Sequence, residues 1–237
     1  MILTSRQSST NGAARVAFVG CLAFLVLASV GSAAIAGTVS YNANFAFPLS
    51  PGSQGLSLPQ WDPALYPGQV LSKVELKIGG NISATVDAEN DSAISGNMGV
   101  DLLGLLKASA PSLAASAGIL QSAGPVAVGP SDGNPGSGPD FVNFGKVSGS
   151  GSASNSLVAG LAPYIGNGNI AATVNGNGGF SVTGVSDSTI HVSAFGADGT
   201  VTVTYTYNPV PEPTSMALAG LSGIGLALAA WRRRRKS

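Results

Sequence analysis

Apolar and polar residues alternate with a period of two along much of the chain between residues 37 and 208. In TVTVTYTY (200–207), valine and tyrosine fill every second position and threonine fills the positions between. The same alternation occurs in TVSYNANFAF (38–47) and in VLSKVELKI (70–78). Because successive side chains of a strand point to opposite faces, this period predicts half-buried β-strands.

Shorter strands are predicted at 82–86, 94–100, 169–174, 180–185 and 189–195. Segments rich in glycine, asparagine and aspartate separate the strands and predict turns at 79–81, 89–92, 175–179 and 196–199. Many short strands with frequent turns predict an all-β fold, an antiparallel β-sandwich of jelly-roll or immunoglobulin-like type. Residues 101–122 fit either a strand pair or a short helix interrupted at Pro111. We expect an exposed loop at 129–140 and a helical turn at 161–166.

Composition and charge narrow the classes of function. Glycine (33) and proline (14) make up about a fifth of the 237 residues, against roughly 12% in average proteins, and only 9% of residues are charged. Residues 37–210 contain four lysines, no arginine and ten acidic residues, a net charge of −6. A phosphate-binding surface needs clustered lysine or arginine, which argues against nucleic acid as a partner. The single cysteine, Cys21, excludes an intramolecular disulfide.

The N-terminal segment has the layout of a secretory signal peptide. Arg6 and Arg15 precede an apolar run at 16–30, and the following SAAIAG places Ala34 and Ala36 in an A-x-A pattern. This predicts cleavage by signal peptidase between Ala36 and Gly37. The alternative is a retained N-terminal membrane anchor, which the length of the apolar run permits.

The C-terminal segment has an apolar run followed by cations. Residues 216–231 carry no charge, and the five cations after them are Arg232, Arg233, Arg234, Arg235 and Lys236. A helix over 216–231 is about 24 Å long, shorter than a hydrocarbon core of about 30 Å, so it spans only with help from flanking polar residues and snorkelling arginines. We predict a transmembrane helix at 215–231 whose cationic tail stays in the cytoplasm, which places the domain before it outside.

Pro211, Glu212 and Pro213 precede this helix. The two prolines remove two backbone donors and favour an extended course, which suits presentation to a protease or transpeptidase. The order of Pro-Glu-Pro, apolar helix and arginine-rich tail resembles the PEP-CTERM sorting signal of exported Gram-negative proteins. The resemblance implies recognition by an exosortase in the inner membrane, cleavage near 211–213, and delivery to the cell surface or an extracellular polymer matrix.

The domain between the two ends carries a second resemblance. Residues 57–93, together with LAPYIGNGNIAATVNGNG (161–178) and ADGTVTVTYTYNP (197–209), are similar to the choice-of-anchor E family of exported bacterial proteins. That family shares one β-rich domain and varies in its anchor. Phenylalanine is expected where this chain has Trp61. The resemblance implies no biochemical activity and no functional residues.

Catalytic chemistry has few candidates in this sequence. His191 is the only histidine, and its predicted strand places it opposite Ile190 and Val192, on a solvated face. A Ser-His-Asp arrangement with Asp187 or Asp198 lacks a G-x-S-x-G nucleophile motif. Glycoside hydrolysis needs two carboxylates at a set separation, and the candidates are Asp62, Asp87, Glu89, Asp91 and Asp101. We predict that the protein is not an enzyme.

A weak calcium site is an alternative to a purely structural acidic turn. Asp87, Glu89 and Asp91 alternate as in the first half of an EF-hand loop, but Ser92 occupies the glycine position and Met98 the position of the bidentate glutamate. The EF-hand is therefore excluded. On a strand that enters a turn, the three carboxylates would share one face, and with Asn90 they could form a surface oxygen site that binds calcium weakly. The other interpretation is a charged, solvent-facing hairpin end, and no other cofactor is predicted.

Aromatic residues in loops offer a possible carbohydrate site. Trp61, Tyr66 and Tyr164 lie in proline-flanked segments and could stack on sugar rings. The alternative for Trp61, in PQWDP, is that its ring closes one end of the sandwich core.

The predicted organisation is a signal peptide at 1–36, one β-sandwich domain at 37–208, and a sorting signal at 209–237. The predicted function is a structural or adhesive role at the cell surface or in an extracellular polysaccharide matrix, after transient insertion of the C-terminal helix in the membrane. The alternative is a carbohydrate-binding or weakly calcium-binding module.

Overall fold

The computed structural model describes residues 36–210 together with 220, 223–224 and 231–232. The predicted signal peptide with Ala34, the Pro211-Glu212-Pro213 motif, most of the helix at 215–231 and the tail after Arg232 lie outside the described residues. The described domain contains eight strands and two short 3₁₀ helices. Their bounds are β1 Gly37–Pro48, β2 Gly52–Pro59, η1 Pro63–Leu65, β3 Gln69–Asn90, β4 Gly96–Ala110, β5 Leu113–Val128, β6 Phe141–Leu157, η2 Ala162–Tyr164, β7 Asn169–Thr183 and β8 Ser188–Pro209.

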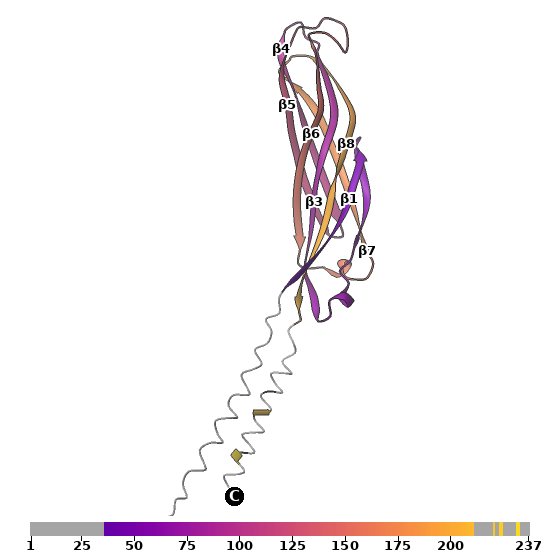
Figure 1. Ribbon diagram of the computed structural model, residues 1–237, viewed down its shortest axis with the longest axis vertical. Helices are drawn as coiled ribbons and strands as arrows, with labels where there is room; N and C mark the ends of the chain where they lie inside the picture. Colours follow the sequence, from indigo (N-terminus) through magenta and orange to yellow (C-terminus); the bar gives the residue numbers. More distant parts are fainter. Residues whose placement is uncertain (1–35, 211–219, 221–222, 225–230, 233–237) are drawn as a thin grey trace, which may run out of the picture. The chain divides into compact units, whose positions relative to one another are not determined.

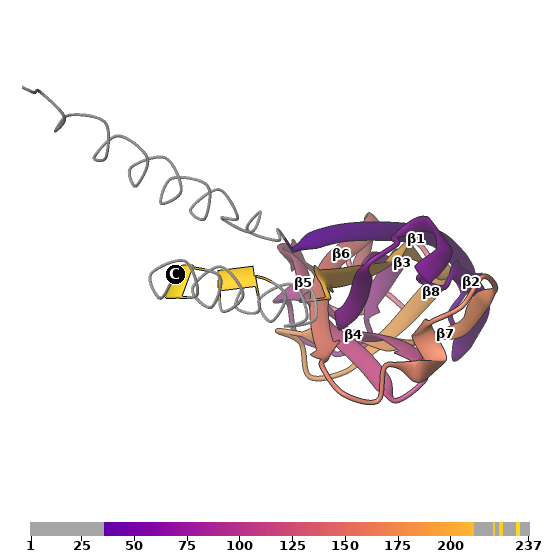
Figure 2. The same cartoon turned by 90° about the horizontal axis from the view of Figure 1, so that it is seen from below.

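The strands form two antiparallel sheets of four strands each. Sheet A has the order β1-β8-β3-β6, and sheet B has the order β2-β7-β4-β5. Successive strands alternate between the sheets except at β4 and β5, which form a hairpin, and the order in both sheets is that of a jelly roll. Figure 1 shows the strands running along the domain, and Figure 2 shows the two sheets as facing layers. The prediction of an all-β, antiparallel fold is confirmed.

One hydrophobic core fills the space between the sheets. On β3, every second residue from Val74 to Ala88 is buried apart from Gly80, so the alternation seen in the sequence continues through nearly the whole strand. Sheet A contributes Ile78, Ile82 and Val201, which are fully buried. Sheet B faces them with fully buried residues that include Leu102, Leu106 and Val174.

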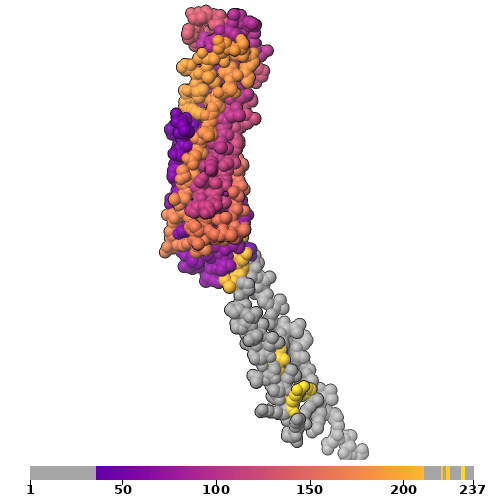
Figure 3. All heavy atoms as spheres, turned by 180° about the vertical axis from the view of Figure 1, so that it is seen from behind, coloured from indigo at the N-terminus to yellow at the C-terminus, as the bar shows by residue number. Residues whose placement is uncertain are grey.

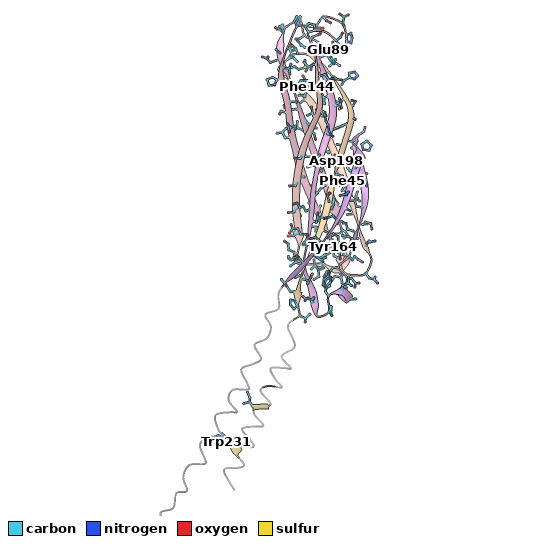
Figure 4. All side chains as sticks on the ribbon, viewed as in Figure 1. Phe45, Glu89, Phe144, Tyr164, Asp198 and Trp231 are labelled. Carbon is cyan, nitrogen blue, oxygen red and sulfur yellow. The ribbon has the colours of Figure 1, made fainter. Side chains whose placement is uncertain are left out.

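Both ends of the described domain lie at the same pole. Gly37 pairs with Tyr207, and Gln69 at the start of β3 pairs with Pro209 at the end of β8. We call this pole the terminal end. The opposite pole, where β3 finishes at Asn90 and β6 begins at Phe141, is the distal end. In Figure 4, Tyr164 marks the terminal end and Glu89 marks the distal end.

Three of the four predicted turns are in fact interior to long strands. Residues 79–81 lie within β3, 175–179 within β7 and 196–199 within β8, and only 89–92 ends a strand. The glycines at these places accommodate close packing instead. Gly80 pairs with both Gly151 and Gly199, and a Cβ on Gly80 would lie 2.9 Å from Cζ of the buried Phe45.

The ambiguous segments are also resolved. Residues 101–122 form the β4–β5 strand pair, and the turn between the strands places Ser112 in the left-handed region (φ 56°). Residues 129–140 form the expected loop, and η2 is the expected helical turn. Strand β2 and the serine- and glycine-rich strand β6 were not predicted, because neither carries a regular alternation of large apolar residues.

Candidate functional site

Aromatic side chains close the terminal end of the core. Trp61 stacks on Tyr66 with ring centroids 5.7 Å apart and an interplanar angle of 11°. Tyr66 also contacts Tyr207 at 4.6 Å, and Tyr164 meets Tyr205 edge-on at 6.4 Å. The segments that supply these rings are the β2–β3 connection, the β6–β7 connection and β8. Backbone bonds from Trp61 N to Tyr164 O (2.9 Å) and from Gly166 N to Trp61 O (3.0 Å) hold the two connections together.

Two buried tyrosine hydroxyls bind proline carbonyls at this end. Tyr205 of sheet A donates to the Pro59 carbonyl of sheet B at 2.8 Å, and Tyr164 donates to the Pro111 carbonyl at 2.6 Å. Burial raises the pKa of both tyrosines above the ordinary value. These bonds link separate parts of the fold and require the protonated form of each hydroxyl.

The structure corrects the sugar-stacking prediction at two of its three residues. Trp61 is 2% exposed and Tyr164 is fully buried, so neither ring presents a face to a ligand. The alternative interpretation of Trp61, that it closes the end of the core, agrees with this burial. Tyr66 is half-buried between Trp61 and Tyr207.

The carboxylates of Asp87, Glu89 and Asp91 do not converge on a common site. In the described part of the chain, no three residues of the types His, Cys, Asp and Glu are grouped closely enough to hold a metal ion. Strand β3 ends at Asn90, so Asp91 leaves the face that Asp87 and Glu89 share. Glu89 accepts from Gly136 N at 3.1 Å, whereas Asp91 accepts from the Thr189 hydroxyl at 2.8 Å. The predicted three-carboxylate calcium site is therefore wrong.

Two fully buried polar residues, Asn90 and Asp140, organise the distal end, and Asp140 was not among the predicted site residues. Asn90 is fully buried and donates through Nδ2 to the carbonyls of Ile94 (2.9 Å) and Gly129 (2.7 Å). Asp140 is also fully buried, and its carbonyl accepts from Asn90 N at 3.0 Å. Asn90 lay in the predicted turn at 89–92, whereas the only sequence signal for Asp140 was its position at the end of a loop rich in glycine and proline.

A shallow hollow lies midway along the outer face of sheet A. It has a volume of 730 Å³ and opens widely to solvent. Gly79 has no side chain to fill the hollow. A Cβ at this position would contact only Ser152 Cβ, at 3.8 Å. Asn81 donates to Asp198 Oδ2 at 3.3 Å beside it. The residues that line the hollow are Gly79, Gly80, Asn81, Ser150, Gly151, Ser152, Asp198, Gly199 and Thr200.

The candidate catalytic residues are spread over the domain. His191 is exposed on β8, as predicted, and its cross-strand neighbour is Asp87 and not Asp187 or Asp198. Asp62 caps η1 by accepting from Ala64 N at 2.9 Å. Asp101 lies on β4 of sheet B, on the opposite sheet from Asp87 and Glu89.

The described domain finishes immediately before the predicted sorting signal. Val210 donates to the Gly68 carbonyl at 2.8 Å, one residue before Pro211. Among the described residues, no helix combines the length and the apolar character that crossing a membrane requires.

Comparisons with known proteins identify the C-terminal segment. Residues 209–235 match the PEP-CTERM protein-sorting motif, so this prediction is confirmed. The motif implies an exported, surface-sorted protein of a Gram-negative bacterium, with an exosortase as its processing partner. No match supports the resemblance of the domain to the choice-of-anchor E family.

No curated protein matches the sequence. Solved structures of infectious bursal disease virus, from the Gt and Gx strains, align with 11% and 10% identity. The alignments cover 77% and 84% of this chain but only 43% and 48% of the viral chains, each with a TM-score of 0.10. The chain thus spans less than half of each viral chain, and a TM-score this low supports no conclusion about fold or function.

Proposed function

We propose that the mature protein is a non-catalytic jelly-roll domain with a structural or adhesive role at the cell surface or in the extracellular polysaccharide matrix. The observation that carries this proposal is the PEP-CTERM motif at 209–235, which follows β8 directly. Signal peptidase removes residues 1–36, the C-terminal helix holds the chain transiently in the inner membrane, and an exosortase cleaves near Pro211–Pro213.

The position of the motif relative to the fold supports this processing route. Strand β8 lies between β1 and β3, so residues that continued it would keep pairing with its neighbours. Pro209, Pro211 and Pro213 lack the N–H that such pairing uses, and they favour extended backbone. The prolines of the predicted cleavage segment therefore oppose further pairing in the sheet.

Exposed apolar side chains at the terminal end also support it. They lie on the loops next to the last described residues of β8, and they are Leu65 (66% exposed), Val158 (72%), Ile165 (41%) and Val210 (48%). A membrane-inserted helix that starts a few residues after Val210 would bring this end of the domain near the lipid surface. Apolar groups on that face are compatible with such a position before cleavage.

A non-catalytic role is supported by what the acidic residues bind. Glu89, Asp91 and Asp198 accept hydrogen bonds from Gly136, Thr189 and Asn81, respectively, and so position loops and neighbouring strands. Glu75 forms an ion pair with Lys73 at 2.8 Å, and the hydrogen bond from Lys73 lowers the pKa of Glu75. These four carboxylates therefore stabilise loops and strands of the fold.

The test is to recover the mature protein from its native cell by fractionation and to sequence both termini by mass spectrometry. We expect Gly37 at the N-terminus, absence of the tail at 232–237, and location at the surface or in the matrix. A Glu212→Ala variant should accumulate uncleaved in the inner membrane, whereas Asp187→Ala, which removes an exposed carboxylate at the distal end, should be processed normally. Wild-type protein that keeps its tail in the inner membrane would refute the proposal.

Carbohydrate binding is a second candidate function, favoured by the hollow on sheet A. Its lining offers hydroxyl, amide and carboxylate groups, which are the partners that sugar hydroxyls use. A Gly79→Leu variant would fill the hollow without meeting the core, and Gly55→Leu adds the same side chain on β2, where a Cβ has open space. Pull-down with extracellular polysaccharide should succeed for wild type and Gly55→Leu and fail for Gly79→Leu. Equal binding by all three would exclude the hollow as the site.

A further inference from the structure

The loop at 129–140 follows a fixed path over the distal end. Gly129 donates to the Pro139 carbonyl at 2.8 Å, which closes the base of the loop, and Ser131 donates to the Ser92 carbonyl at 2.8 Å. Figure 3 shows this part of the chain, in pink, at the tip of the domain opposite the terminal end. These hydrogen bonds therefore hold the loop in a defined conformation at the distal end.

Two aspartates of the loop each use one carboxylate oxygen to hold its backbone. Asp132 Oδ1 accepts from Asn134 N at 2.8 Å, and Asp140 Oδ2 accepts from Asp132 N at 2.9 Å. The second oxygen of each carboxylate borders Gly138, where a Cβ would lie 2.8 Å from Asp140 Oδ1 and closer still to Asp132 Oδ2. The two second oxygens are thus no more than about 5 Å apart, so one cation at about 2.3–2.6 Å from each can contact both.

Asp140 Oδ1 is the atom that requires an explanation. The side chain of Asp140 is 0% exposed, and Oδ1 has no hydrogen-bond partner. A buried carboxylate oxygen without a donor is costly, and here the group that faces it across Gly138 is a second carboxylate. An ordered water or a bound cation would supply the missing partner, and only the cation also offsets the repulsion between the two facing carboxylates.

The described part of the chain supplies no cation to this site. Its one ion pair, between Lys73 and Glu75, lies towards the terminal end. Lys146, the nearest lysine in sequence to Asp140, sits on β6 opposite Thr85. Six of the ten acidic residues of the domain gather at the distal end, and they are Asp87, Glu89, Asp91, Asp132, Asp140 and Asp187. Their combined field attracts mobile cations.

Gly138 keeps the space between the two oxygens open. Its φ of +104° lies in the region that side chains rarely adopt, and any side chain there would occupy the place that both oxygens border. The donors available are carboxylate oxygens, backbone carbonyls and water, with no sulfur or imidazole. This set suits Ca²⁺, which accepts irregular oxygen coordination, better than Zn²⁺, which prefers nitrogen and sulfur, or Mg²⁺, which demands octahedral geometry.

We propose that Asp132 and Asp140 bind a calcium ion at the distal end, with loop carbonyls and water completing its coordination. The ion replaces the missing partner of Asp140 Oδ1 and ties the loop to the first residues of β6. With only two carboxylates, the dissociation constant belongs in the range of extracellular modules, about 10⁻⁴–10⁻³ M.

The test uses the full-length chain in detergent, with thermal unfolding followed by tryptophan fluorescence in EDTA and in CaCl₂ at ten times the dissociation constant. A ligand at that concentration that binds only the native state stabilises it by about 1.4 kcal/mol, which raises the Tm by about 3–6 °C. Asp132→Asn and Asp140→Asn should both lose this response. Each variant keeps an oxygen for the backbone hydrogen bond and replaces the second oxygen with an amide nitrogen.

The variants also separate calcium binding from the alternatives. Asp187→Asn removes the same charge from an exposed residue of the distal end and should keep the full calcium shift. In EDTA, Asp140→Asn should be at least as stable as wild type, because its amide can donate to Asp132 Oδ2. An unchanged wild-type Tm in calcium would overturn the proposal in favour of an ordered water as the partner of Asp140 Oδ1. Equal shifts in all four proteins, reproduced by MgCl₂, would overturn it in favour of general charge screening.

Discussion

The hydroxyl of Tyr205 makes a bond between the two sheets that a single substitution can test. Tyr205→Phe removes only the oxygen that donates to the Pro59 carbonyl at 2.8 Å, from a side chain that is 0% exposed. Loss of one partner from a buried hydrogen bond costs about 1–3 kcal/mol. With a urea m-value of about 2 kcal/mol per M, a loss of about 2 kcal/mol lowers the unfolding midpoint by about 1 M.

The assay is urea unfolding of the full-length chain in detergent, followed by fluorescence of Trp61, whose ring is buried against Tyr66. Tyr207→Phe is the matched control, because Tyr207 lies two residues along the same strand and is only half-buried, so water can replace any partner of its hydroxyl. Its effect should stay within about 0.5 kcal/mol. Equal midpoints for the two variants would show that the bond from Tyr205 contributes nothing.

Three further outcomes follow from the same contacts. Because burial raises the pKa of Tyr205 and Tyr164, the unfolded chain loses these protons first above about pH 10. Stability, complete below that pH, should fall as the pH rises further, and a Tyr205→Phe, Tyr164→Phe double variant should show a shallower fall in pH-dependent urea unfolding. Gly80→Val should destabilise strongly, since a Cβ there would lie 2.6 Å from a backbone carbonyl oxygen, whereas Gly55→Val should not, as thermal unfolding will show. Trp61→Ala should cost about 3–5 kcal/mol in urea unfolding followed by far-UV circular dichroism, since this variant lacks the fluorescent reporter, and a neutral effect would contradict its role in the core.

The alternation of apolar residues was sufficient to predict the all-β class, because burial on one face of a strand is a local, periodic requirement. It failed at the glycine-rich segments. Glycine is a turn signal when a sequence is considered locally, but at Gly80 and Gly199 its missing side chain makes room for Phe45, which comes from a strand more than thirty residues away in sequence. Phe45 lies beside these glycines because of the order of the strands in the sheet. The alternation of apolar residues carries no information about that order.

The candidate sites also differ in whether the sequence alone could predict them. The sorting motif was predictable because its parts are contiguous and ordered along the chain, so no knowledge of the fold was required. The three-carboxylate site was wrong because it assumed that β3 continued to Asp91, whereas the strand ends one residue earlier. Asp140 was missed because its burial depends on the packing of the loop at 129–140 over Asn90, a contact between residues fifty apart.

The direction of the strands connects the sorting signal to the distal loop. Gly37 and Pro209 both lie at the terminal end, so both ends of the described domain are at one pole. Strand β3 runs from that pole to the other through 22 residues, which at about 3.3 Å per residue is roughly 70 Å. A chain attached through the residues after Val210 would therefore present the acidic loop with Asp132 and Asp140 at the greatest distance from its attachment. Under the proposed processing route, the terminal end, with its buried aromatic rings and prolines, faces the attachment, and the distal end stays exposed to ions, polymer or other cells.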